Sequence, residues 1–255
     1  MNGTPIRKFP SARRFMNAGF TLVELAVAIF IISLILGSIL VPLTTQIEQR
    51  QISDTQKMLD EIRDALMGFA VANGYLPCPD RTTGGAGTLN DTNSDGVEDV
   101  STGGICQPLS GTIATGNLPW ATLGLGNQDA WGNRFRYMVL STFAQRAPAL
   151  PFSIDTTANT LRVCNSQACA SPRITDAAVA VIVSHGNNGL GAISVDTNLA
   201  RPAPTSNDEI ENTDADLDTV SRVKSNVANA EFDDIVVWLP KFTLINRMVA
   251  AGKRP

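Results

Sequence analysis

The sequence is poor in the residues that build most catalytic and zinc sites. Of its 255 residues one is histidine and four are cysteine, and no two cysteines are spaced as C-x-x-C. A structural zinc site needs four such ligands, usually in close pairs. The histidine, His185, follows Ser184 directly, but neighbouring residues on a strand point to opposite faces, and there is no G-x-S-x-G motif. The sequence therefore predicts neither an enzyme nor a zinc protein.

Charge is missing from two stretches near the N-terminus. Residues 1–19 contain four basic residues and no acidic one, and Leu25–Leu43 contains no charged residue. As a helix the second stretch would be about 28 Å long, enough to cross the hydrocarbon core of a bilayer. Basic residues before an apolar span keep that end in the cytoplasm. We therefore expect a single-pass anchor with the chain after Leu43 outside the cytoplasm, where disulfides persist.

Basic residues are scarce in the rest of the chain. Without the four basic residues of the first stretch, 16 basic residues face 24 acidic ones, a formal charge of −8. This charge makes nucleic acid an unlikely partner, because phosphate binding needs a basic surface. An acidic cluster is expected to be a solvated loop, with a divalent-ion site as the less common alternative. Its members are Asp208, Glu209, Glu211, Asp214, Asp216 and Asp218.

The apolar run opens with G-F-T-L-V-E-L at residues 19–25. This motif resembles the processing site of type IV prepilins and type II secretion pseudopilins, where prepilin peptidase cuts after the glycine and the new N-terminal Phe is methylated. The resemblance implies processing between Gly19 and Phe20, which retains the apolar segment. It also implies an assembly role for Glu24, whose carboxylate needs a positive partner in apolar surroundings. Other pilin or pseudopilin subunits, bacterial inner-membrane lipid and the inner-membrane assembly platform are the further partners implied.

A helical period continues beyond the apolar run. An apolar stripe with one polar member follows 3,4,3,4,3 spacing at Ile52, Thr55, Leu59, Ile62, Leu66 and Phe69. One helix is expected from Thr21 to Ala72, weakened at Gly37 and Pro42. The expected organisation is a leader at 1–19, a transmembrane half-helix at 20–43, an amphipathic periplasmic half at 44–73 and a β-rich globular domain at 74–255.

Strand signals follow in the globular part. Strands are expected at Leu161–Cys164, Ala178–Ser184, Ala192–Val195 and Asp234–Leu239, and the spacing of Phe242, Ile245 and Val249 predicts a short closing helix before Gly252. The run D-A-W-G-N-R-F-R-Y at 129–137 predicts a turn and a half-buried strand, and it resembles the D-x-W-G-N-x-aromatic-x-Y segment of major pseudopilins. The fold class is α+β: a long N-terminal helix, its first half transmembrane, packed on a mainly antiparallel sheet.

The region from Cys78 to Pro119 shows no periodicity and needs a staple. Pairing Cys78 with Cys106 would close it, which favours Cys164 with Cys169 as the second disulfide, although the other two connectivities remain open.

The same region contains D-T-N-S-D-G-V-E-D at 91–99, which matches the first nine positions of an EF-hand loop. Its calcium ligands would be Asp91, Asn93, Asp95 and Asp99. Thr102 stands where the bidentate Glu belongs, so Glu98 or a distant acid would have to supply that ligand. The alternative is an ordinary polar turn.

Together these features predict a structural subunit, a minor pilin or pseudopilin of a type IV pilus or type II secretion filament. The resemblance implies periplasmic exposure of the C-terminal domain and later incorporation into the filament. An adhesin or DNA-binding minor pilin displayed on the filament is the alternative function.

Substituting Gly19 tests the processing prediction. Gly19→Arg places a large charged residue at the cut and should block processing. The variant extracted from membranes should therefore keep its first 19 residues, whereas the parent chain should begin at a methylated Phe20. Intact-mass spectrometry of both proteins checks this. A parent N-terminus at any other residue contradicts the prepilin interpretation.

Overall fold

The computed structural model describes residues 20–81, 94–106, 109–110, 112–149, 152–153, 156 and 160–253, without the side chains of 38–43 and 109–110. The chain divides into two units, Met1–Glu48 and Gln49–Pro255. The helix α1 (Leu22–Asn73) contributes to both, and its assignment is continuous through Gly37 and Pro42. Within the described part of the chain, no helix is long and apolar enough to cross a membrane.

In the globular unit, α1 buries the face that its period predicts. Thr55, Leu59, Ile62 and Leu66 are fully or almost fully buried, and the three apolar residues join the core of the sheet. The last residue of the stripe, Phe69, is half-buried and packs edge-on against Tyr75. The amphipathic half of α1 therefore forms one wall of the core.

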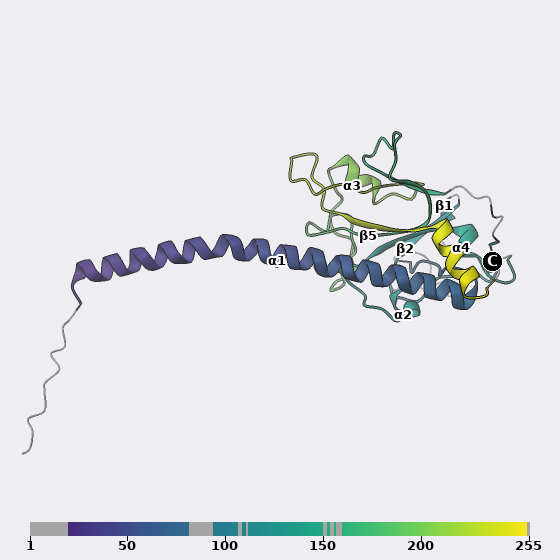
Figure 1. The fold of residues 1–255 in the computed structure, drawn as a ribbon, viewed down its shortest axis with the longest axis horizontal. Helices are drawn as coiled ribbons and strands as arrows, with labels where there is room; N and C mark the ends of the chain where they lie inside the picture. Colours follow the sequence, from purple (N-terminus) through teal and green to yellow (C-terminus); the bar gives the residue numbers. More distant parts are fainter. Residues whose placement is uncertain are drawn as a thin grey trace, which may run out of the picture. The chain divides into compact units, whose positions relative to one another are not determined.

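A mostly antiparallel sheet forms the other wall (Figure 1). Its strands run β1-β2-β3-β5-β4-β6, and β7 also pairs with β5. Only β4 and β6 pair in parallel among the described strands. The strands are β1 (Leu109–Ser110), β2 (Ile113–Asn117), β3 (Arg136–Leu140), β4 (Leu161–Cys164), β5 (Thr175–Ser184), β6 (Asp218–Val220) and β7 (Ile235–Pro240). The structure is thus α+β, as predicted.

The strand β5 lies at the centre of the sheet. It pairs with β3, β4 and β7, and every side chain from Ala178 to Ser184 is buried. A strand with apolar side chains on both faces is buried on both faces only in such an interior position. The predictions of a central strand here and of a strand at Leu161–Cys164 are therefore confirmed.

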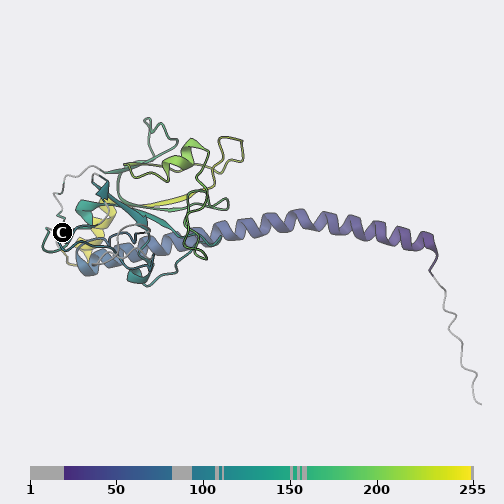
Figure 2. The same cartoon turned by 180° about the vertical axis from the view of Figure 1, so that it is seen from behind.

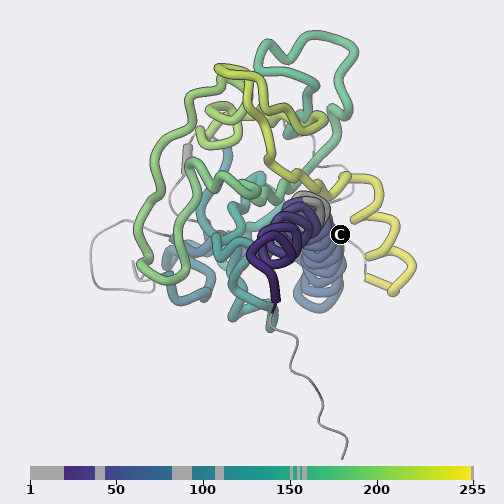
Figure 3. The backbone as a smooth tube through the Cα atoms, turned by 90° about the vertical axis from the view of Figure 1, so that its left-hand side faces the viewer, coloured from purple at the N-terminus to yellow at the C-terminus, as the bar shows by residue number. Residues whose placement is uncertain are grey.

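Short helices complete the unit: α2 (Trp120–Leu123), a 3₁₀ turn (Ser141–Phe143), α3 (Asn207–Glu211) and α4 (Lys241–Ala250). Two views show α4 beside the C-terminal turns of α1 (Figures 1 and 2). Figure 3 shows the connection from β5 to β7, green to yellow-green, on the side of the unit away from α4. That connection holds α3 and β6.

The turn at 129–133 explains why its motif has the residues it has. One oxygen of Asp129 accepts hydrogen bonds from the backbone N–H groups of Trp131 and Asn133, both at 2.9 Å, and the other accepts one from the Ser184 hydroxyl at 2.7 Å. The N–H of Ala130 donates to Thr55 Oγ1 of α1 at 3.3 Å. The turn therefore joins β5 to α1, and the polar member of the stripe is its contact.

Several expectations about individual elements are wrong. The segment Ala192–Val195 makes only isolated bridges, and β2 lies in the region thought to lack regular structure. Arg134 alternates with Phe135 in the run predicted to be a half-buried strand, yet both residues are buried. The Arg134 guanidinium donates to Asn198 Oδ1 and lies over the Trp120 ring, which compensates the buried charge.

The disulfides pair Cys78 with Cys106 and Cys164 with Cys169, with Cα separations of 5.2 and 5.1 Å. These are the two pairs that the sequence favours. The first joins the chain after α1 to the segment before β1, and the second closes a short turn after β4.

The orientation of α4 provides a stability test. Val249 is 54% exposed, whereas Leu244 is fully buried in the core. Leu244→Ala should lower the free energy of unfolding by about 2 to 5 kcal/mol because it leaves a cavity. Val249→Ala on the same helix should change it by less than about 1 kcal/mol. Urea unfolding measures both, and equal losses would contradict this packing.

Candidate functional site

The first turn of α1 carries two residues of the processing motif. Thr21 Oγ1 accepts the N–H of Glu24 at 3.2 Å, and Glu24 Oε2 accepts the backbone N–H and the hydroxyl of Thr21, both at 2.9 Å. This reciprocal arrangement is a capping box, which satisfies backbone donors at a helix start. Gly19 lies outside the described residues, whereas Phe20 directly precedes the cap and is exposed. Glu24 thus has a local structural role that the motif alone does not reveal.

The apolar side chains of Phe20 and of the first part of α1 are exposed in the described structure. The large ones between Phe20 and Leu36 are between 49% and 86% accessible. They are Phe20, Leu22, Val23, Leu25, Val27, Ile29, Phe30, Ile31, Ile32, Leu34, Ile35 and Leu36. An apolar surface of this extent is characteristic of a segment that contacts lipid or other protein chains.

A second feature lies beside the Cys78–Cys106 disulfide. Asp80 is 1% exposed, and its Oδ2 accepts the N–H of Gly96 at 2.9 Å. Burial, reinforced by the charges of Asp95 and Asp99, raises the pKa of Asp80 to about 7. Asp95 accepts the N–H of Val97, and Asp99 accepts that of Arg81, both at 2.8 Å. Three carboxyl groups therefore gather around this turn.

The predicted calcium ligands are only partly within the described structure. Asp95 and Asp99 are two of the three carboxyl groups around the turn just described, while Asp91 and Asn93 lie outside the described residues. Glu98 is committed elsewhere, since Oε2 accepts the N–H of Cys78 at 3.0 Å and Oε1 pairs with Arg146 at 2.6 Å. Its contacts support the disulfide, and Asp80 is the additional acid near the loop.

A third feature is a buried acidic cluster around His185. Carboxylate oxygens of Glu209, Asp233 and Asp234 lie within 4.8 Å of one another. Glu209 Oε2, Asp233 Oδ1 and Asp234 Oδ1 are buried without a hydrogen bond in the described structure. His185 is 1% exposed, and its Nδ1 lies 3.5 Å from Asp234 Oδ1. Oxygen ligands at this spacing could hold a hard divalent cation.

The electrostatics of this cluster follow from its burial. Burial raises the pKa of Glu209 to about 7, although its Oε1 accepts hydrogen bonds from Asn188 Nδ2 and the Asp233 N–H, and the charges of Asp234 and Asp233 raise it further. Burial also raises the pKa of Asp233. A negative charge on one of these carboxyl groups thus disfavours ionisation of its neighbours, and a bound proton or cation would reduce the repulsion.

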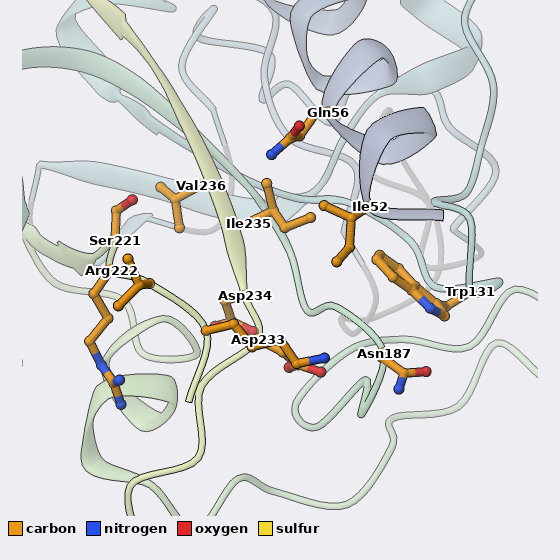
Figure 4. Close-up of a pocket in the computed structure, with 12 residues that line it drawn as sticks. Ile52, Gln56, Trp131, Asn187, Ser221, Arg222, Asp233, Asp234, Ile235 and Val236 are labelled. Atoms are coloured by element: carbon orange, nitrogen blue, oxygen red, sulfur yellow. The ribbon is translucent and has the colours of Figure 1, made fainter. Parts of the chain in front are cut away.

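A pocket of about 340 Å³ adjoins the cluster (Figure 4). Ile52 and Gln56 of α1 line one side with Trp131, and the segment 221–224 lines the other. Asp233 and Asp234 lie between these two walls. The adjacent Ser184 and His185 do not form a nucleophile–base pair, because the hydroxyl of Ser184 donates to Asp129.

Comparison with known proteins identifies the N-terminal feature. Residues 14–40 match the sequence profile of the prokaryotic N-terminal methylation motif, the signature of type IV pilins and pseudopilins. The match covers Gly19, Phe20 and Glu24, and ends within the apolar part of α1. The chain therefore carries a pilin-type N-terminus, which implies processing by prepilin peptidase and assembly with other pilin-type subunits. No curated protein and no solved structure matches the chain.

Sequence reasoning missed the buried cluster. Glu209 and Glu211 belong to the stretch predicted to be a solvated loop, but both are buried, and so is His185. The ends of β5 and β7 and the helix α3 converge from distant positions in the chain, which local charge patterns do not encode. The only sequence signal was Asp233-Asp234 immediately before a strand.

The pKa of Glu209 predicts a pH dependence. A carboxyl whose folded pKa is raised stabilises the folded chain fully below its unfolded pKa of about 4.5, and this contribution is lost as pH rises through about 7. In the presence of a chelator, the unfolding free energy of the wild-type chain should fall by roughly 1 to 3 kcal/mol between pH 5 and pH 8, relative to that of Glu209→Gln. The amide oxygen of the variant can keep both hydrogen bonds, so the two proteins differ mainly in the titrating carboxyl.

Urea unfolding at the two pH values measures this change in unfolding free energy. Asp196→Asn, a substitution of an exposed carboxylate, is the control. The control should follow wild type at both values. Parallel pH profiles for wild type and Glu209→Gln would show that Glu209 does not titrate in this range.

Proposed function

We propose that this chain is a structural, non-enzymatic subunit of a type IV pilus or type II secretion filament, and specifically a minor pilin or pseudopilin. The observation that carries the proposal is the methylation motif at residues 14–40 at the start of a helix whose apolar side chains are exposed. A protein that used this surface only for its own core would have buried it. Filament assembly gives the surface a partner.

Membrane insertion precedes assembly in this proposal. The apolar run Leu25–Leu43, which includes the undescribed side chains of 38–43, lies in the bacterial inner membrane of the precursor. The four basic residues before it hold the leader in the cytoplasm, and the globular unit lies in the periplasm. The exported location agrees with the two disulfides.

Processing then creates the group that Glu24 needs. Prepilin peptidase cuts between Gly19 and Phe20, and the freed α-amino group, with an ordinary pKa near 8, is mostly cationic at neutral pH. In the described structure only Oε2 of Glu24 takes part in the capping box, so Oε1 can accept a further charge-assisted bond. Pairing with the Phe20 amine of a neighbouring subunit would set the axial register of the filament.

Features of the globular unit support the minor-subunit assignment. Between β5 and β7 the chain inserts α3, β6 and long connections, which enlarge the domain on the side away from α4 (Figure 3). Such additions suit a subunit present in few copies, because a major subunit must repeat closely along the filament. The net charge of −8 after removal of the leader disfavours DNA as the ligand of this surface.

A calcium ion at Asp91, Asn93, Asp95 and Asp99 remains part of the proposal. Its support is Asp80, a buried carboxyl beside Asp95 and Asp99 whose pKa is raised to about 7. A cation would neutralise this group and order the stretch closed by the Cys78–Cys106 disulfide.

Two substitutions at Glu24 separate charge from helix capping. Glu24→Val removes both, whereas Glu24→Gln keeps an acceptor for the capping box. If the charge pairs with a neighbouring amine, both variants should reach the membrane but enter filaments at least about tenfold less than wild type, which corresponds to about 1.4 kcal/mol.

Immunoblots of sheared filaments and of membranes from the same cells measure this ratio. Glu61→Gln, on an exposed part of α1, is the matched control and should assemble normally. Normal assembly of Glu24→Gln would reduce Glu24 to a capping residue, and normal assembly of Glu24→Val would remove the register role altogether.

A further inference from the structure

A second pocket, of about 440 Å³, adjoins the pocket of about 340 Å³ beside the acidic cluster. The two pockets share Asn187, Lys224 and Asp233 in their walls, and all of their lining residues belong to the globular unit. The walls are formed by α1, the turn at 129–133, the loop after β5 and the chain from 221 to 236. Together the two pockets form one elongated site, which we call the paired pocket.

Part of the wall of the paired pocket is apolar. Ile52 of α1 and Trp131 line the smaller pocket on one side (Figure 4), and Ile235 and Val236 of β7 add further apolar surface. Trp131 is only half-buried, so part of its ring is accessible. Aromatic and aliphatic side chains in a pocket wall bind the non-polar face of a ligand.

The remaining wall is rich in side chains that both donate and accept hydrogen bonds. Gln56 and Asn187 are exposed amides in the smaller pocket, and Asn226 is an exposed amide in the larger one. Ser221 and Ser225 add hydroxyl groups. An amide offers two N–H donors and an oxygen acceptor, and a hydroxyl also has both functions. Such a wall matches a ligand whose own groups donate and accept at the same atom, as hydroxyl groups do.

The charges in the wall of the smaller pocket offset one another. Two positive and two negative side chains line it: Arg222, Lys224, Asp233 and Asp234. Arg222 pairs with Asp208 at 2.6 Å. Burial raises the pKa of Asp233, and the positive charge of Lys224 counteracts this effect. The wall therefore favours a neutral ligand over an anion or a cation.

Polar atoms on three residues of this wall are buried without a hydrogen-bond partner in the described structure. They are Nε1 of Trp131 and the Oδ1 atoms of Asp233 and Asp234. The indole nitrogen is a donor, whereas the carboxylate oxygens are acceptors. A hydroxyl group can serve both kinds of atom, whereas a metal ion serves only the carboxylates and an anion only the indole. These atoms thus also favour a neutral ligand with hydroxyl groups.

We propose that the paired pocket binds a neutral saccharide of two pyranose rings. The C–H groups of one ring face would pack on Trp131 and Ile52, and the hydroxyl groups would bond to the amides of the wall. Two adjoining pockets give room for two rings. The site would add saccharide recognition to a structural subunit. It does not depend on filament assembly, so it can be tested on the isolated chain.

The test uses the full-length chain in lauryldimethylamine oxide, a detergent without a sugar headgroup. Cellobiose, chitobiose and maltose are the neutral probes, and digalacturonate is the anionic comparison. Titration calorimetry should show saturable binding of at least one neutral disaccharide with a Kd below about 1 mM, and digalacturonate should bind at least about tenfold more weakly. Binding should also change the tryptophan fluorescence, because Trp131 lines the site.

Variants of the wall locate the bound disaccharide. Trp131→Ala removes the aromatic surface and should raise the Kd at least about tenfold, whereas Trp131→Phe keeps a ring and should retain binding but lose the fluorescence change. Asn187→Ala removes one amide and should raise the Kd about fivefold. Asn187 is exposed, so its variant keeps the test valid if the Trp131 variants fail to fold. Asn246→Ala removes an exposed amide of α4 outside both pockets and should leave the Kd unchanged.

Three results would overturn the proposal. The first is an absence of saturable binding of all three neutral disaccharides up to about 10 mM. The second is an unchanged Kd in both Trp131→Ala and Asn187→Ala, which would place the saccharide elsewhere on the chain. The third is tighter binding of digalacturonate than of every neutral disaccharide, which would contradict the preference for a neutral ligand.

Discussion

The globular unit depends on the burial of one face of α1 against the sheet. Leu59, Ile62 and Leu66 belong to the same hydrophobic core as the buried residues of β5, and Thr55 joins the same face through its hydrogen bond to the Asp129 turn. Removing a leucine from such a site leaves a cavity and costs several kcal/mol, a large part of the total stability of a domain. The amphipathic half of α1 is therefore an internal element of the domain.

The N-terminal half of α1, in contrast, exposes its apolar side chains. Its apolar side chains from Leu22 to Leu36 are exposed, and the capping box of Thr21 and Glu24 fixes where the helix begins. One helix thus combines a face that the domain buries itself with a surface that needs lipid or other subunits to bury it. A free amine on Phe20 would place a positive charge at the end of that surface, close to the one carboxylate in it.

Sequence patterns predict those parts of the fold that local periodicity controls. The stripe on α1 and the run at Ala178–Ser184 identified the two walls of the core, because burial imposes periods of 3.6 or a continuous apolar strand. Local sequence patterns do not predict burial where the contacting residues are distant in the sequence. Arg134 is buried through Asn198 and Trp120, and Glu209 through Asn188 and Asp233, contacts that no local window contains. Asp91 and Asn93 lie outside the described residues, so that predicted site stays a prediction.

The central claim is that membrane or neighbouring subunits cover the exposed half of α1. A photo-reactive phenylalanine analogue at Phe30 in living cells tests it directly, with the same analogue at the exposed Val223 as the reference. The analogue at position 30 should form adducts with lipid before assembly and with pilin-type subunits in filaments, while the analogue at position 223 should form neither. Equal, low adduct yields at both positions would contradict it.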